Sequence, residues 1–145
     1  MERTVSSLEE LEAFAQEFAD ALAPDAGATL VTLSGELGAG KTAFTQALAR
    51  ALGVAETVNS PTFVLEKTYA LPEGGAFERL VHIDAYRLNG GNELGPLDVD
   101  VLLRDPGNLI VLEWPERVSD ALPAAARELA FRVTEDGSRI ISYDA

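Results

Sequence analysis

The chain has 145 residues, of which 47% are hydrophobic, and this length and composition predict one domain, residues 1–145, with a sizeable buried core. It has no cysteine and no apolar run of roughly eighteen residues, which excludes disulfides, thiolate metal sites and a membrane span, so we expect a cytoplasmic protein. Twenty-four acidic against eleven basic residues give a net charge of −13, which argues against strong direct binding to DNA or RNA because that requires a basic surface.

The first predicted element is a helix over residues 8–22. Ser7 and Glu10 have the spacing of a capping box, in which side chains satisfy backbone N–H groups at the start of a helix. Apolar side chains then recur at helical spacing, and Pro24 closes the segment. This apolar stripe predicts that one side of the helix packs on a core.

Residues 35–42 fit the phosphate-binding loop pattern G-x-x-x-x-G-K-[ST] at every position. An apolar run at 28–33 predicts a strand that leads into the loop, and residues 42–52 predict a helix that leaves it. In this motif, backbone N–H groups and the helix dipole bind a phosphate chain. Lys41 is expected to reach the β- and γ-phosphates, and the Thr42 hydroxyl to coordinate Mg²⁺. The sequence therefore predicts a protein that binds a nucleoside triphosphate.

The rest of the chain alternates short strands with turns. Further strands are predicted at residues 62–69, 79–86, 108–113, 128–133 and 139–143. The segment 89–103 is glycine-rich and acidic before a short helix that begins at Asp98, and Asp136-Gly137 joins the last two strands as a hairpin. These elements predict an α/β fold with a mixed sheet, one face of which is covered by the two longer helices.

Two carboxylates compete for the metal-binding role. Glu113 ends the hydrophobic strand 109–113, which has the form of a Walker B element, and such a carboxylate holds Mg²⁺ directly or through water. Asp84 is the other candidate, either for the metal or for positioning the attacking water. The alternative for both residues is that they are ordinary acidic residues on a strand, with no role in metal binding. A lone histidine is more often structural than catalytic, so we do not assign His82 to the metal.

Two weaker signals leave their alternatives open. Asn59 to Thr62 lies where several phosphate-loop proteins keep a switch that senses the γ-phosphate, although Ser-Pro-Thr also initiates ordinary turns. Trp114, the only tryptophan, either packs in the core or stacks on the nucleotide or on a partner.

Taken in order, these motifs resemble the TsaE family, the small ATPases of bacterial tRNA threonylcarbamoyladenosine synthesis. The resemblance covers nearly the whole chain and rests on the phosphate loop, on Ser60 to Phe63, on His82 to Leu88 and on Leu112 to Glu116. The last two motifs at this spacing are far more specific than the loop alone. Glu36 replaces the family's usual aspartate, and Ala43 stands where a second threonine is common; both changes leave the phosphate chemistry intact.

The resemblance implies a P-loop NTPase-like fold, in which a mixed, largely parallel sheet is flanked by helices and ends in a C-terminal β-hairpin. It implies ATP and Mg²⁺ as cofactors and the TsaB–TsaD heterodimer as partner, so that tRNA is reached only indirectly, through the complex. ATP hydrolysis would support turnover of that complex without transferring the threonylcarbamoyl group.

The resemblance also implies the site residues. Lys41, Asp84 and Thr62 would form the catalytic or switch region, while Thr42 and Glu113 would hold Mg²⁺. Tyr86 and Arg87 would shape the nucleotide pocket or the partner face. The residues expected to bind the nucleotide are Glu36, Leu37, Gly38, Ala39, Gly40, Lys41, Thr42, Ala43 and Trp114.

Two other functions stay open. A small-molecule kinase needs an acceptor pocket and usually an arginine-bearing lid, for which residues 89–103 leave only limited room. A nucleotide-dependent assembly module would bind nucleotide with negligible turnover. The sequence motifs of regulatory GTPases are absent, which favours ATP over GTP. Because no arginine finger is unambiguous and Arg87 is only a candidate, we expect a Mg-dependent ATPase that is weak alone and depends on the partner complex.

Overall fold

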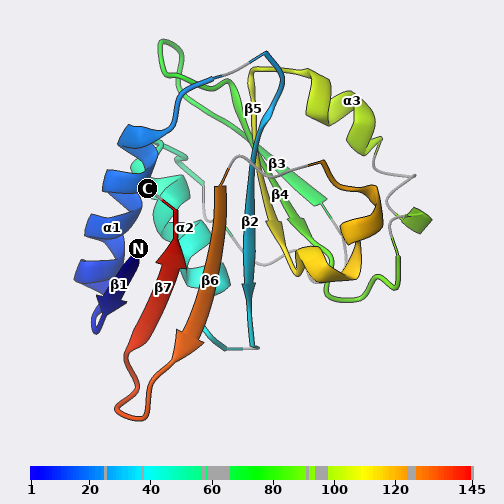
Figure 1. The fold of residues 1–145 in the computed structure, drawn as a ribbon. Helices are drawn as coiled ribbons and strands as arrows, with labels where there is room; N and C mark the ends of the chain where they lie inside the picture. Colours follow the sequence, from blue (N-terminus) through cyan, green and yellow to red (C-terminus); the bar gives the residue numbers. More distant parts are fainter. Residues whose placement is uncertain are drawn as a thin grey trace.

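The structure is a computed structural model that describes residues 1–24, 26–36, 38–56, 58, 66–90, 92–93, 98–123 and 127–144. Its strands are β1 (Glu2–Val5), β2 (Thr29–Gly35), β3 (Glu66–Ala70), β4 (Arg79–Asp84), β5 (Asn108–Glu113), β6 (Arg127–Val133) and β7 (Arg139–Tyr143). Its α-helices are α1 (Leu8–Ala21), α2 (Lys41–Ala51) and α3 (Val99–Arg104), and the 3₁₀ helices η2 (Pro115–Arg117) and η3 (Ser119–Ala121) follow β5. The strands form one sheet in the order β1-β7-β6-β2-β5-β4-β3 (Figure 1).

The centre of the sheet is parallel and its two sides are antiparallel. β2 pairs in parallel with β5 and β6, and β4 pairs in parallel with β5, whereas the β1–β7, β6–β7 and β3–β4 pairs are antiparallel. The register places Leu33 of β2 and Asp84 of β4 beside Glu113 of β5. The carboxyl ends of three strands therefore meet at one edge, which is where open parallel sheets bind ligands.

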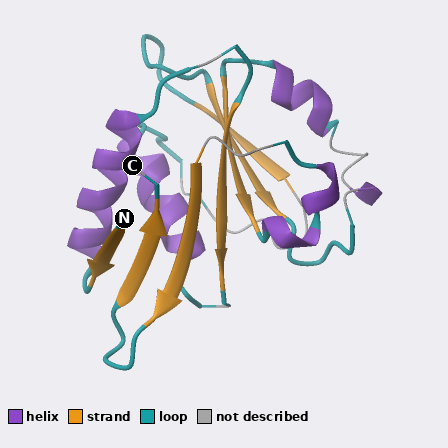
Figure 2. Ribbon diagram, viewed as in Figure 1, coloured by secondary structure: helices purple, strands orange, loops and turns teal. Residues whose placement is uncertain are grey.

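Helices cover both faces of the sheet. α1 and α2 pack together on one face, and α3 lies on the other (Figure 2). In β5, Leu109 and Val111 join the core under α1 and α2, while Ile110 and Leu112 join the core of the opposite layer. A central parallel strand that is buried on both faces needs such a continuous apolar run, which is why this strand was predictable with its correct bounds.

The start of α1 shows how local chemistry fixes a helix boundary. The Ser7 hydroxyl accepts a hydrogen bond from the Glu10 N–H at 3.1 Å, as the capping box predicts. The Glu10 carboxylate accepts from the Ser6 N–H at 2.8 Å, one residue before the position that the motif ordinarily uses. Two backbone donors at this end of the helix are thereby satisfied.

The predicted fold class is confirmed, and most predicted elements are confirmed within one or two residues. The C-terminal strands form the expected antiparallel hairpin, and Gly137 takes the positive φ of 88° in its turn. The predicted strand 79–86 instead ends at Asp84, because the Asp84 carboxylate accepts a hydrogen bond from the Tyr86 N–H and closes a turn. Of the predicted strand 62–69, residues 62–65 lie outside the described residues, and β3 continues to Ala70.

Strand β1 was not predicted from the sequence. It is four residues long, and only Val5 is buried. Such a short, mostly polar segment carries no alternation of its own. It is a strand because it pairs with β7, whose residues are far away in the sequence.

The core between the helices and the sheet is built around Phe44 of α2, which is fully buried. Its ring centroid lies 5.8 Å from that of Phe14, 5.7 Å from that of Phe18 and 5.7 Å from that of Phe131. These rings come from α1, α2 and β6. Phe44 therefore ties the helix that follows the phosphate loop to the rest of the layer.

We expect Phe44→Ala to lower the free energy of unfolding by about 3–5 kcal/mol, because a fully enclosed ring is removed and the cavity cannot collapse freely. Urea unfolding followed by circular dichroism measures the change. Val101→Ala on α3 is the control, since that side chain is 60% exposed. Equal losses in the two variants would contradict the assignment of Phe44 as the central core residue.

Candidate functional site

The candidate site lies at the carboxyl edge of the central strands. Gly35 ends β2 and opens the phosphate loop, whose last residues begin α2. Glu113 ends β5, and Asp84 ends β4 directly beside it. The sheet therefore brings the loop and both candidate carboxylates together, although they are distant in sequence.

The loop backbone requires glycine at two of its positions. Gly35 has φ 140°, and a Cβ there would lie 2.4 Å from the carbonyl oxygen of Phe131, so any other residue would clash with β6. Gly40 has φ 105° and precedes α2 without any side-chain cap on the helix. The first N–H groups of α2 therefore have no side-chain acceptor, which leaves them oriented for an anion. Leu37 lies outside the described residues.

Lys41 is 5% exposed and is turned back onto the loop. Its ammonium donates hydrogen bonds to the carbonyl oxygens of Gly35 and of Glu36, the latter at 3.0 Å. It also lies 4.0 Å from the ring centroid of Trp114, a cation–π contact. Burial lowers the pKa of Lys41 below its usual value, and the opposing attraction of Glu113, Glu116 and Asp84 offsets only part of that effect.

Thr42, Glu113 and His82 form a hydrogen-bonded chain. The Thr42 hydroxyl donates to the Glu113 carboxylate, with oxygen–oxygen distances of 3.2 and 3.4 Å. His82 Nε2 lies 2.5 Å from Glu113 Oε2. His82 is fully buried and Glu113 is 2% exposed.

The oxygen atoms of Thr42 and Glu113 suit a hard divalent cation such as Mg²⁺, because such ions prefer oxygen ligands. Within the described part of the chain, no group of three or more histidine, cysteine or acidic residues is gathered to hold a metal. A cation here would therefore complete its coordination with phosphate oxygens and water. This is how Mg²⁺ is ordinarily held at nucleotide sites.

Aromatic and cationic side chains border the site. The ring centroids of Tyr86 and Trp114 are 5.0 Å apart, and the Arg117 guanidinium lies 5.4 Å from the first and 5.8 Å from the second. Trp114 has φ 62°, a conformation that is uncommon outside glycine. Arg87 is exposed. The sequence had pointed to Trp114 and Tyr86 but not to Arg117. The contacts of Arg117 with the two rings depend on the turn of η2.

Two functional candidates were missed because they depend on contacts between distant segments. Arg139 at the start of β7 donates to the carbonyl oxygens of Gly137 at 2.6 Å and of Gly38 at 3.2 Å, so it touches the phosphate loop. His82 was expected to be structural, and its bond to Glu113 was not foreseen. Thr62, the predicted switch residue, lies outside the described residues.

An apolar hollow of about 270 Å³ adjoins the phosphate loop. Ala39, Gly40 and Ala43 line it from the loop side, and Arg139 lines it from β7. Leu8 and Leu11 of α1 also line it, and the other lining residues are Val5, Ser6, Ser7, Phe131, Gly137 and Ile141. The hollow and the phosphate loop therefore share Ala39 and Gly40 as walls.

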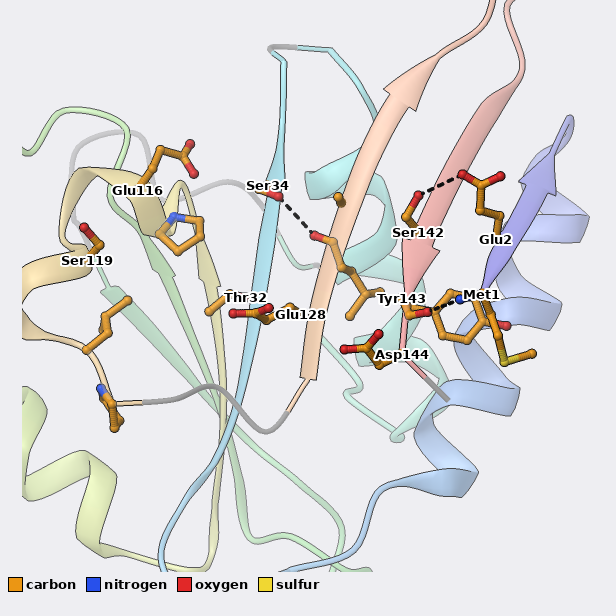
Figure 3. A pocket seen from close by; sticks show the side chains of 15 residues that line it. Met1, Glu2, Thr32, Ser34, Glu116, Ser119, Glu128, Ser142, Tyr143 and Asp144 are labelled. Atoms are coloured by element: carbon orange, nitrogen blue, oxygen red, sulfur yellow. Dashed lines mark hydrogen bonds between the residues drawn. The ribbon is translucent and has the colours of Figure 1, made fainter.

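A larger hollow of about 710 Å³ lies on the opposite face of the sheet, where Thr32 of β2 and Glu128 of β6 sit side by side (Figure 3). Its lining carries four carboxylates, from Glu2, Glu116, Glu128 and Asp144. Negative charges of this kind repel phosphate groups. A phosphate-bearing ligand would therefore suit the glycine loop better than the larger hollow.

Among the described residues, no helix is long and apolar enough to cross a membrane.

The glycine loop between β2 and α2, together with the strand-end carboxylate, defines a protein of the phosphate-loop α/β class. A sequence profile of the family described as "Threonylcarbamoyl adenosine biosynthesis protein TsaE" matches residues 5–141. The chain belongs to the TsaE family, which acts in threonylcarbamoyladenosine biosynthesis on tRNA. The predicted resemblance is thereby confirmed.

Individual relatives agree with this assignment. A Streptomyces coelicolor protein named tRNA threonylcarbamoyladenosine biosynthesis protein TsaE is 53% identical over 88 residues, which are 60% of this chain and 57% of that protein, less than two thirds of its length. A Rickettsia bellii protein of the same name is 34% identical over 137 residues, which are 94% of this chain and 89% of that protein. The crystal structure of Bacillus subtilis YdiB superposes with a TM-score of 0.75 at 27% identity and covers 99% of this chain and 83% of its own.

The buried ammonium of Lys41 predicts a pH dependence of stability. Because its pKa is lowered in the folded protein, the unfolded chain binds this proton more tightly, and the protonated group costs folding free energy at neutral pH. That cost begins to fall when the pH exceeds the folded-state pKa and is gone once the pH exceeds the pKa of Lys41 in the unfolded chain. We therefore expect Lys41→Met to unfold at a temperature no lower than the wild type at pH 7, with its advantage shrinking towards about pH 10.

Thermal unfolding followed by circular dichroism across this pH range measures the difference. Lys67→Met is the control, because Lys67 is exposed. An advantage of Lys41→Met that grows with pH would contradict the burial cost.

Proposed function

We propose that this protein binds and hydrolyses ATP with Mg²⁺, as an accessory to the TsaB–TsaD heterodimer in threonylcarbamoyladenosine modification of tRNA. The observation that carries the proposal is that Lys41, Thr42 and Glu113 lie together at the N-terminus of α2, which has no side-chain cap. Lys41 supplies a positive charge for the phosphates, and Thr42 and Glu113 supply oxygen ligands for the Mg²⁺ that accompanies them.

The phosphate chain would replace the present partners of Lys41. Its ammonium now donates to loop carbonyl groups, and phosphate oxygens are stronger acceptors for the same donors. The N–H groups at the start of α2 would donate hydrogen bonds to the phosphates. Trp114 keeps the ammonium partly shielded from water, which strengthens its attraction to an anion.

A bound Mg²⁺ would neutralise charge on the phosphate oxygens and favour departure of the terminal phosphoryl group. Thr42 and Glu113 are the residues that would hold it. Asp84 lies at the next strand end, beside Glu113, and would orient a water molecule or support the metal site. Its carboxylate already holds the Tyr86 N–H, so it sits on an ordered turn.

The nucleoside would occupy the 270 Å³ hollow beside the loop. Its largely apolar walls would pack on the flat faces of a base, and the Arg139 guanidinium, which lines the hollow, would stack on one of them. Because Arg139 also bonds the Gly38 carbonyl, base binding and loop conformation would be linked.

The charge of the chain favours a role through a protein partner. With a net charge of −13, this protein is repelled by the phosphate backbone of tRNA. The heterodimer would hold the tRNA, while this protein would supply ATP-dependent turnover.

The decisive experiment measures multiple-turnover threonylcarbamoyladenosine formation on tRNA by reconstituted TsaB–TsaD supplied with threonylcarbamoyl-AMP. We expect stimulation by this protein with ATP, and a stimulated rate about 10²–10³-fold lower with Lys41→Ala, because one transition-state charge contact is lost. Lys67→Ala is the matched control and keeps full stimulation. Equal stimulation by Lys41→Ala would favour an assembly module over an ATPase, and no stimulation by the wild type would contradict the proposed function.

A second experiment tests whether the nucleotide base binds in the hollow beside Arg139. We expect Arg139→Gln to weaken ATP binding by about 3–10-fold, because the guanidinium face that would stack on the base is lost together with its hydrogen bond to the Gly38 carbonyl. Isothermal titration calorimetry with a non-hydrolysable ATP analogue measures the affinity. Arg132→Gln is the control, since Arg132 lies on the adjacent strand and pairs with Glu2. Equal affinities in the two variants would place the base elsewhere.

A further inference from the structure

His82 is a fully buried polar residue that the proposed chemistry does not use. It belongs to β4, where Val81 and Ile83 pack into the layer opposite α2. Its own side chain therefore faces the α2 side, as does that of Glu113. The β4–β5 register sets His82 opposite Val111, two residues before Glu113 on the same face of β5. The pair is thus built on two neighbouring central strands and not on loops.

The hydrogen bonds assign the tautomer of His82. Nδ1 is buried and has no hydrogen-bond partner among the described residues, whereas Nε2 lies 2.5 Å from a carboxylate oxygen. A proton on Nδ1 would leave a buried donor unsatisfied and would turn the Nε2 lone pair towards that oxygen. The proton is therefore on Nε2, and His82 donates to Glu113.

Glu113 in turn determines how Thr42 is oriented. Both carboxylate oxygens accept from the Thr42 hydroxyl, at 3.2 and 3.4 Å. With its proton directed to Glu113, the Thr42 oxygen keeps its lone pairs free on the other side. A carboxylate held from one side only would rotate more freely, and the Thr42 hydroxyl would lose its fixed direction.

We propose that His82 is a positioning residue for the cation site. It acts through Glu113 to direct the oxygen of Thr42 towards the metal, and it touches neither metal nor nucleotide itself. Hydrogen bonds of this kind to a metal-binding carboxylate typically change metal affinity by about 10–100-fold. The inference rests on the proposed function, because it assumes a cation beside the phosphate loop.

Three substitutions separate positioning from packing. His82→Gln keeps an amide N–H at about the reach of Nε2, His82→Asn carries the same group on a side chain too short to reach Glu113, and His82→Leu removes the donor but fills the space. The measurement is the dissociation constant of Mn²⁺ in the presence of a non-hydrolysable ATP analogue, by electron paramagnetic resonance. Metal-free binding of the same analogue, in EDTA, and the melting temperature are measured beside it.

We expect Mn²⁺ affinity to fall about 10-fold or more in His82→Asn and His82→Leu and to be largely rescued in His82→Gln, with metal-free nucleotide binding unchanged in all three. Unchanged Mn²⁺ affinity in a folded His82→Leu would overturn the proposal. So would a loss of affinity in His82→Gln as large as in His82→Asn, or losses that follow the melting temperature. Failure of the wild type to bind the analogue at all would instead contradict the proposed function.

Discussion

The parallel pairing of β2 with β5 is the constraint on which the site depends. It sets Leu33 beside Glu113, so that the chain leaves β2 into the glycine loop next to the carboxylate that ends β5. Shifting this pairing by one residue would turn the Glu113 side chain to the other face of the sheet, away from Thr42. The apolar residues of β5, which pack on both faces, make such a shift costly. The hydrophobic core therefore determines where the polar chemistry can be.

Buried polar groups lie at the carboxyl edge of the central strands, although a protein core normally excludes such groups. Lys41, His82 and Glu113 are each at most 5% exposed. Charged and polar groups are costly to bury unless they are paired, and here each one has a partner of complementary chemistry. Some of the free energy gained in the aromatic core around Phe44 is thus offset at the site. This is the usual relation between a stable scaffold and a polar site that binds a charged ligand.

Prediction from the sequence worked where the determinants are local. The cap at Ser7, the buried run of β5, the phosphate loop and the hairpin at Gly137 each have their cause within a few residues. It did not work for β1, for the bond between His82 and Glu113, or for the contact of Arg139 with Gly38. Each of these depends on which strands become neighbours, and no residue pattern within one segment carries that information. The elements of the candidate site could therefore be named from the sequence, but the hydrogen bonds that orient them could not.

The pairing of β1 with β7 has a consequence for the order of folding. Glu2 and Ser142, opposite each other in the ladder, are separated by 140 residues, so β1 has no partner until β7 has been synthesised. Closing so long a loop is entropically slow compared with forming the local contacts of α1, α2 and β2. During translation, β1 therefore cannot form its pairing with β7 until the end of the chain has been made. We therefore expect the edge strand β1 to be added late, after β7 has joined the sheet.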